Sequence, residues 1–161
     1  MNKEEYKFEI AVYDSIDELS QDDAFLLSEA RKITEKAYAP YSHFNVGAFA
    51  RLMNGQTIGG TNQENASYPA GICAERTLMS AAGTLFPGVG IETMAISYHN
   101  LQGHSNTPAS PCGICRQFFA EFQTRTGQPI RVILSGMEGK VQIVEDVINL
   151  LPLVFTAEDM K

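Results

Sequence analysis

Apolar and polar positions alternate near the start of the chain and then recur at helical spacing. Phe8, Ile10 and Val12 alternate with their neighbours, which predicts a half-buried strand at the edge of a sheet. Ser20 is followed three residues later by an acidic residue, and apolar residues then recur every three or four positions, so a helix is predicted over residues 21–38.

The middle of the chain has the pattern of a hairpin. Residues 44–53 and 56–60 are extended in character, and the Asn54-Gly55 pair between them is the strongest short-range signal for a two-residue turn. Residues 61–71 are polar and are broken by proline and glycine, so we expect a loop there. Loops of this kind often carry functional residues.

Two further helices are predicted to begin at cysteines, one at Cys73 and one at Cys112, because apolar residues follow each at helical spacing. The remaining predicted elements are strands over residues 92–98, 130–134 and 141–144 and a short apolar helix over residues 147–151. Strands interleaved with helices indicate an α/β fold, with helices covering a mixed sheet of about five strands in a single three-layer domain over residues 1–161. Residues 1–19 are expected to be an N-terminal extension that can add an edge strand.

Composition limits the class of protein. A chain of 161 residues with 44% apolar residues suits one domain with a sizeable core. The three cysteines are an odd number, and the first residues are polar and lead into no apolar run, so we expect a reduced, cytoplasmic protein. No segment approaches the roughly 20 apolar residues that span a bilayer, which excludes a membrane-embedded protein.

The charge balance disfavours polyanionic partners. Twelve basic residues against 19 acidic ones give a net charge of −7, and the basic residues are scattered along the chain. Nucleic acid is therefore not expected as the main partner.

The three cysteines form the most informative pattern. Cys112 and Cys115 are three residues apart at a predicted helix start, and Cys73 begins the other helix. Helix N-termini favour thiolates, and three protein ligands are typical of a catalytic zinc ion, which keeps a fourth position for water. A C-x-x-C pair alone is equally typical of a redox pair or of packing.

Charged residues follow the cysteines closely. Arg76 and Arg116 are each within three residues of a candidate ligand, and we expect one or both to donate hydrogen bonds to the sulfurs and so offset their charge. Glu75 is placed to exchange protons with a zinc-activated water, although a carboxylate at a helix start also interacts favourably with the helix dipole. C-A-E followed by P-C-x-x-C matches the signature of zinc deaminases.

Four motifs in order resemble the cytidine deaminases of the small homotetrameric type. They are residues 38–48 (YAPYSHFNVGA), 62–69 (NQENASYP), 71–76 (GICAER) and 110–117 (SPCGICRQ). The resemblance implies one zinc ion per subunit held by Cys73, Cys112 and Cys115, and proton transfer by Glu75. It also implies a nucleoside substrate, a homotetramer and a place in pyrimidine salvage.

The same resemblance implies substrate contacts. Asn62 and Glu64 are expected to bind the ribose hydroxyls, Phe44 and Tyr68 to shape the base pocket, and the backbone near Ala74 to hold the base edge. Without the resemblance, Phe44 and Tyr68 could equally be core or packing residues, and Asn62 and Glu64 could be turn residues.

The implied reaction is the hydrolytic deamination of cytidine or deoxycytidine to the uridine product and ammonia. The alternatives are a deaminase of another aminopyrimidine nucleoside or antibiotic, a non-enzymatic zinc-binding module, and a polynucleotide deaminase, which the charge disfavours. Residues 150–155 resemble the C-terminal segment of the family, in which a phenylalanine reaches a neighbouring active site. Leu153 and Val154 replace the small pair expected there, so the intersubunit role of Phe155 is left open.

Overall fold

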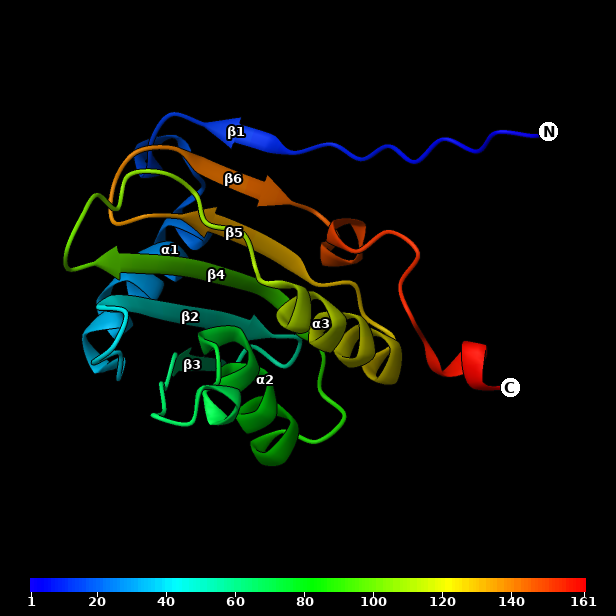
Figure 1. The fold of residues 1–161 in the computed structure, drawn as a ribbon. Helices are drawn as coiled ribbons and strands as arrows, with labels where there is room; N and C mark the ends of the chain where they lie inside the picture. Colours follow the sequence, from blue (N-terminus) through cyan, green and yellow to red (C-terminus); the bar gives the residue numbers. More distant parts are fainter.

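The computed structural model describes all residues, Met1 to Lys161, and is built on one six-stranded sheet with helices on both faces (Figure 1). The strands are β1 (Ala11–Tyr13), β2 (Phe44–Leu52), β3 (Thr57–Thr61), β4 (Ile91–Asn100), β5 (Arg131–Ser135) and β6 (Val141–Val144). The α-helices are α1 (Gln21–Ile33), α2 (Ala74–Leu85) and α3 (Gly113–Thr126). Short 3-10 turns are formed by Ile16–Glu18, Thr34–Lys36, Tyr68–Ala70, Val147–Leu150 and Ala157–Met160. The mixed α/β architecture agrees with the sequence prediction, with β1 as the additional strand.

The sheet has the order β1-β6-β5-β4-β2-β3 and contains one parallel pair. β4 and β5 run parallel because α3 connects them, whereas all other neighbouring strands are antiparallel. The predicted hairpin joins β2 to β3, and Gly55 in its turn has a φ of 81°, a conformation that glycine adopts without steric cost.

The two faces of the sheet carry separate cores. α1 covers one face, where Leu26, Leu27 and Ala30 pack against apolar residues of β4, β5 and β6. α2 and α3 cover the other face, and this larger core includes Leu78, Phe119 and Phe122 and side chains from β2, β4 and β5. In Figure 1, α1 lies behind the sheet and α2 and α3 lie in front of it. No helix is both long enough and apolar enough to cross a membrane.

α1 begins as predicted and ends earlier. The Ser20 side chain caps it by accepting a hydrogen bond from the Asp23 backbone N–H. The α-helix stops at Ile33, and residues 34–36 tighten into a 3-10 turn instead of continuing to residue 38. The Thr34 hydroxyl donates to the Arg31 carbonyl at 2.7 Å, and threonine bonds of this kind compete with regular helix geometry.

The prediction for the first strand was wrong in length and in the burial of its apolar face. β1 contains only residues 11–13, and Phe8, Ile10 and Val12 are 39%, 40% and 55% exposed. Tyr13, on the opposite face, is the residue that packs against the α1 core. Alternation was visible in the sequence, but Phe8 and Ile10 precede the residues that pair with β6, and Val12 points to the opposite face from Tyr13.

The start of α2 lies very close to β3, and glycine makes this possible. A side chain at Gly60 would come within 2.6 Å of the Leu78 backbone nitrogen and 2.7 Å of the Ala74 carbonyl oxygen. The absence of a Cβ therefore lets the first turn of α2 rest on the sheet. This contact fixes the position of the residues that begin the helix.

Candidate metal centre and active site

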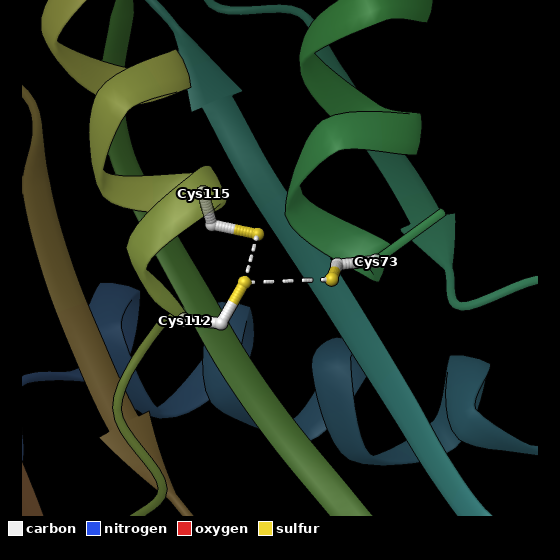
Figure 2. A group of neighbouring side chains, drawn as sticks. All are labelled: Cys73, Cys112 and Cys115. Atoms are coloured by element: carbon white, nitrogen blue, oxygen red, sulfur yellow. Dashed lines mark hydrogen bonds between the residues drawn. The ribbon is translucent and has the colours of Figure 1, made fainter. Parts of the chain in front are cut away.

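The three cysteine sulfurs meet at the N-termini of α2 and α3 (Figure 2). Cys73 and Cys112 are the N-cap residues of these helices, and Cys115 lies in the first turn of α3. The Cys112 Sγ is 3.8 Å from the Cys73 Sγ and 3.6 Å from the Cys115 Sγ, and all three sulfurs lie within 4.8 Å of one another. The tertiary fold thus brings together residues that are 39 positions apart in the sequence.

This sulfur cluster fits a zinc ion. Sulfurs bound tetrahedrally at ~2.3 Å from zinc lie roughly 3.8 Å apart, which matches the two measured separations. None of the three cysteines forms a disulfide. The cluster also favours negative charge, because the neighbouring Cys115 thiol and the Arg76 guanidinium lower the pKa of Cys73 to about 5. Cys115 is buried, and its pKa is raised by its contact with Cys73 and by burial.

Glu75 lies beside the sulfurs in the first turn of α2 and is only 5% exposed. Burial and the neighbouring Cys73 raise the pKa of its carboxyl group above the ordinary value for glutamate. A raised pKa moves a carboxyl group towards the pH range in which it can both accept and donate protons, as general acid–base chemistry requires.

The two arginines near the cysteines have different partners. Arg76 Nη2 donates to the Gly71 carbonyl at 3.2 Å and lies 4.0 Å from the Cys73 Sγ. Arg116 makes no hydrogen bond to a sulfur; its Nε donates to the Pro111 carbonyl at 2.8 Å and its Nη1 to the Leu150 carbonyl at 2.7 Å. The expected arginine–sulfur contact is thus made by Arg76, while Arg116 joins the loop before Cys112 to the C-terminal segment.

A cavity of about 470 Å³ opens beside the sulfurs, a volume suited to a small-molecule ligand. Its lining includes the sheet residues Phe44 and Val46, the loop residues Asn62 and Glu64, and Glu75. Cys73, Cys112, Tyr68 and Ser110 line it as well. The structure therefore places most of the candidate site residues around one space.

The side chain of Asn62 is largely engaged with the backbone of β2. Its Oδ1 accepts from the Val46 backbone N–H at 2.7 Å, and its Nδ2 donates to the Phe44 carbonyl at 2.9 Å. Asn62 thereby fixes the strand that carries Phe44 and keeps one further amide N–H. Glu64 accepts from the backbone N–H groups of Tyr41 and Ser42 through Oε2, and hydrogen bonding from Ser42 lowers its pKa, so the carboxylate is charged at neutral pH.

Three other candidate residues are placed differently. Tyr68 is 75% exposed at the rim of the cavity and contacts the Tyr41 ring edge-on, with 6.0 Å between ring centroids. Ala74 is fully buried as the first residue of α2 and does not line the cavity. Phe155 is 58% exposed on the outer side of α3, where its carbonyl accepts from the Gln117 Nε2, and it lies outside the cavity.

Sequence reasoning missed Tyr98, which lines the cavity from β4. Its ring stacks on that of Phe44, with centroids 4.5 Å apart and an angle of 14° between the planes. Period-two alternation within β4 predicts that Tyr98 shares a face with Ile96. Alternation does not show what packs against this face of β4, so only the fold identifies Tyr98 as part of the site.

Comparison with known proteins agrees with this geometry. Residues 20–128 match the family model described as the cytidine and deoxycytidylate deaminase zinc-binding region. The chain is 39% identical over 139 residues to a cytidine deaminase of Halalkalibacterium halodurans, an alignment that covers 86% of this chain and 98% of that protein. It is 35% identical over 135 residues to the cytidine deaminase of Sporosarcina psychrophila, covering 84% and 92% of the two chains.

Solved structures give the same result. The crystal structure of a cytidine deaminase from Burkholderia pseudomallei superposes with a TM-score of 0.71 at 34% identity, and the match covers 85% of this chain and all of that one. A cytidine deaminase from Mycobacterium tuberculosis superposes with a TM-score of 0.64 at 26% identity over 85% of this chain and 99% of that one. With a three-sulfur zinc site at the same two helix starts that the motifs indicate, the chain belongs to the zinc-dependent cytidine and deoxycytidylate deaminase family.

Proposed function

We propose that the protein catalyses the hydrolytic deamination of cytidine and deoxycytidine, converting each with one water molecule to uridine or deoxyuridine and ammonia. The observation that carries this proposal is a buried carboxyl group, Glu75, next to three clustered cysteine sulfurs at the wall of a cavity of about 470 Å³. The similarity to proteins named cytidine deaminase supports the choice of substrate.

Cys73, Cys112 and Cys115 would hold the zinc ion in this proposal. Zinc, when bound by such residues, supplies an activated water for hydrolysis. Three thiolates exceed the charge of the cation by one unit, and the Arg76 guanidinium beside Cys73 offsets that charge. Cys115 is buried in the first turn of α3, which keeps one side of the cluster away from solvent.

Glu75 would move the protons of the reaction. It takes a proton from the attacking water and delivers one to N3 of the base, which makes C4 more electrophilic. After the water oxygen has bonded to C4, Glu75 carries the remaining proton of that hydroxyl to the exocyclic nitrogen; the C4–N bond then breaks, ammonia leaves, and C4 keeps the oxygen as a carbonyl. The position of Glu75 suits this double role, because its buried carboxyl group lies beside the sulfurs at the wall of the cavity.

The substrate contacts follow from the lining of the cavity. Glu64 uses Oε2 for backbone contacts and has Oε1 left to accept a hydrogen bond from a sugar hydroxyl. Asn62 contributes its remaining amide N–H from the same loop. Phe44 and Tyr68 provide aromatic surface for the base and the entrance. The backbone around Ser110, which lines the cavity, and around Ala74, whose neighbours Cys73 and Glu75 line it, is proposed to hold the base edge.

We further propose that residues 1–161 act as one domain and assemble as a homotetramer in the cytoplasm, where the reaction serves pyrimidine salvage. Three unpaired cysteines support a reducing compartment. The exposed apolar surface formed by Ile114, Phe155 and Met160 on the outer side of α3 supports association, because exposed apolar clusters often mark interfaces.

An absorbance assay with cytidine, deoxycytidine, cytosine, dCMP and guanine tests the substrate class. We expect turnover of the two nucleosides and little or none of the free bases, because cytosine and guanine carry no sugar hydroxyl for Glu64 to bind. Preference for cytosine or dCMP over both nucleosides would contradict the proposal.

The Glu75→Gln variant tests the proton transfer. It keeps the size of the side chain but cannot exchange a proton, so we expect full zinc content and a loss of kcat of at least about 10²-fold. Zinc measured by atomic spectroscopy provides the control. A variant with full zinc and substantial residual turnover would show that another group moves the protons.

A further inference from the structure

Tyr98 is held in place by the residue that shapes the base pocket. Its ring stacks on Phe44 at a centroid separation of 4.5 Å, and Tyr98 is only 6% exposed. β2 and β4 pair in register so that Val46 lies opposite Tyr98, and both side chains line the cavity. Stacked aromatic pairs gain stability beyond the area they bury, so the two rings form one rigid part of the cavity surface.

The other end of Tyr98 is also anchored. Its hydroxyl lies 3.4 Å from the hydroxyl of Thr107, in the loop that connects β4 to α3. This loop brings Ser110 to the cavity and ends at Cys112. Contacts at the ring and at the hydroxyl leave Tyr98 little freedom to move when a ligand enters.

Tyr98 and Glu75 line the cavity from different elements, β4 and α2. α2, which carries Glu75, packs on β2 and β3, whereas β4 lies on the other side of β2. Figure 1 shows α2 over the β3 end of the sheet and α3 over β4 and β5. A planar base that turns one edge to Glu75 can therefore turn its opposite edge to the β4 side of the cavity.

The chemistry of the proposed reaction determines which edge of the base faces Glu75 and which faces the β4 side. In cytosine, C4 lies opposite N1 in the ring, so the reacting carbon points to the sulfur cluster when the sugar on N1 points to Glu64. Of the two remaining edges, the one with N3 must face Glu75, which exchanges a proton with it. The edge formed by C5 and C6 is left to face Tyr98. This step rests on the proposed function.

We propose that Tyr98, held by Phe44 and Thr107, is a specificity-determining residue that closes the cavity against substituents on C5 of the cytosine ring. Cytidine carries only hydrogen at C5 and fits beside the phenol ring. A methyl group or a halogen at C5 requires Tyr98 to move, which breaks the stack on Phe44. The resulting loss of kcat/KM relative to cytidine, here called the C5 penalty, grows with the size of the substituent.

The test compares cytidine, 5-methylcytidine, 5-bromocytidine and 5-iodocytidine in the wild type and in the variants Tyr98→Ala, Tyr98→Leu and Tyr98→Phe. We expect kcat/KM for the iodo substrate relative to cytidine to rise by about tenfold in Tyr98→Ala and by less in Tyr98→Leu, because hydrophobic pockets discriminate by that order for small groups. Tyr98→Phe keeps the ring and should keep the penalty. Dissociation constants of uridine and 5-iodouridine, measured by calorimetry, should change in parallel, since these ligands bind without turnover.

Tyr41→Ala is the matched control, because it removes an equal ring close to Glu64 that lies outside the cavity lined by Tyr98. We expect it to affect all four substrates alike and to preserve the C5 penalty. If Tyr98→Ala does not fold, as judged by zinc content and circular dichroism, Tyr98→Leu decides the question.

An unchanged C5 penalty in the folded alanine or leucine variant, or an equal loss of the penalty in Tyr41→Ala, would overturn the role of Tyr98 alone. Failure of the wild type to deaminate cytidine would overturn the proposed function and this inference together.

Discussion

Three neighbouring residues at the start of α2 have different roles in the site. Cys73 provides a sulfur, Glu75 is buried with a raised pKa, and Arg76 reaches back to the Cys73 Sγ at 4.0 Å. Helical geometry separates them, because residues two and three positions after the N-cap point in different directions. The Arg76 Nε is buried without a hydrogen-bond partner, so the guanidinium stays beside the sulfurs at a cost in solvation.

This placement predicts that Arg76→Gln weakens zinc retention. Removing the guanidinium leaves the excess negative charge of three thiolates uncompensated, and changes of this kind typically cost about 10–100-fold in metal affinity. The rate of zinc release to a colorimetric chelator measures the effect. Arg31→Gln is the control, because Arg31 donates hydrogen bonds to Ser135 and Gly136 and projects from α1, on the other face of the sheet. Equal release rates for wild type and Arg76→Gln would contradict the prediction.

Between elements, an ion pair fastens α1 to the sheet. Arg131 of β5 donates two hydrogen bonds to the Asp23 carboxylate of α1, at 2.7 and 3.0 Å. Burial raises the pKa of Asp23, but the hydrogen bonds and positive charge of Arg131 outweigh it and hold the pKa below the ordinary value. Bidentate pairs of this type are directional, so this one fixes the first turn of α1 over β5.

The lowered pKa predicts how stability depends on pH. The carboxylate is favoured in the folded state, so its contribution is complete above the unfolded pKa of ~3.9 and is lost as pH falls through the lower folded pKa. Asp23→Asn should therefore reduce the free energy of unfolding at neutral pH by about 1–3 kcal/mol. The difference from wild type should shrink below pH ~4.

Urea denaturation between neutral and acidic pH measures this difference, with Asp22→Asn as the control. The Asp22 side chain is 74% exposed and lies 3.3 Å from Arg51, so its loss should have a much smaller effect. A wild-type advantage over Asp23→Asn that stays constant down to strongly acidic pH would show that the pair does not act through its charge.

At the scale of the whole molecule, the C-terminal segment is coupled to the active site without entering it. Arg116 holds the Leu150 carbonyl and the Pro111 carbonyl together, next to Cys112. Farther along, Leu153 is fully exposed with a φ of 57°, and Phe155 is 58% exposed on the outer side of α3. An exposed phenylalanine outside the cavity of its own chain is available to a neighbouring subunit of the proposed tetramer.

This predicts complementation between two defective variants. Phe155→Ala alone should lower activity, and Glu75→Gln alone should abolish it, while each protomer stays folded with zinc bound. In mixed oligomers, a subunit with intact Glu75 can receive Phe155 from its neighbour, so activity after co-refolding should exceed the sum of the separate variants. Activity equal to that sum would show that Phe155 does not complete a neighbouring site.

Local patterns in the sequence were enough to predict much of the fold and the three cysteines that cluster in it. The turn at Asn54-Gly55, the cap at Ser20 and the helix starts at Cys73 and Cys112 depend on residues a few positions apart, and the structure has each of them. Secondary structure at these points is set by backbone geometry and short-range hydrogen bonds. The three candidate ligands were singled out by their spacing together with the C-A-E and P-C-x-x-C signature.

Long-range packing decided what the sequence left open. Contacts between distant segments decide three features. They decide which side of β1 is exposed, which arginine contacts the sulfurs (Arg76 and not Arg116), and that Tyr98 stacks on Phe44. Asn62, expected to bind sugar, directs most of its hydrogen bonds to β2. The sequence determined which groups could bind a metal or transfer a proton, because it specifies residue types and their local spacing. The tertiary structure decided which of them meet, because burial and hydrogen-bond partners are set only when the sheet and helices pack.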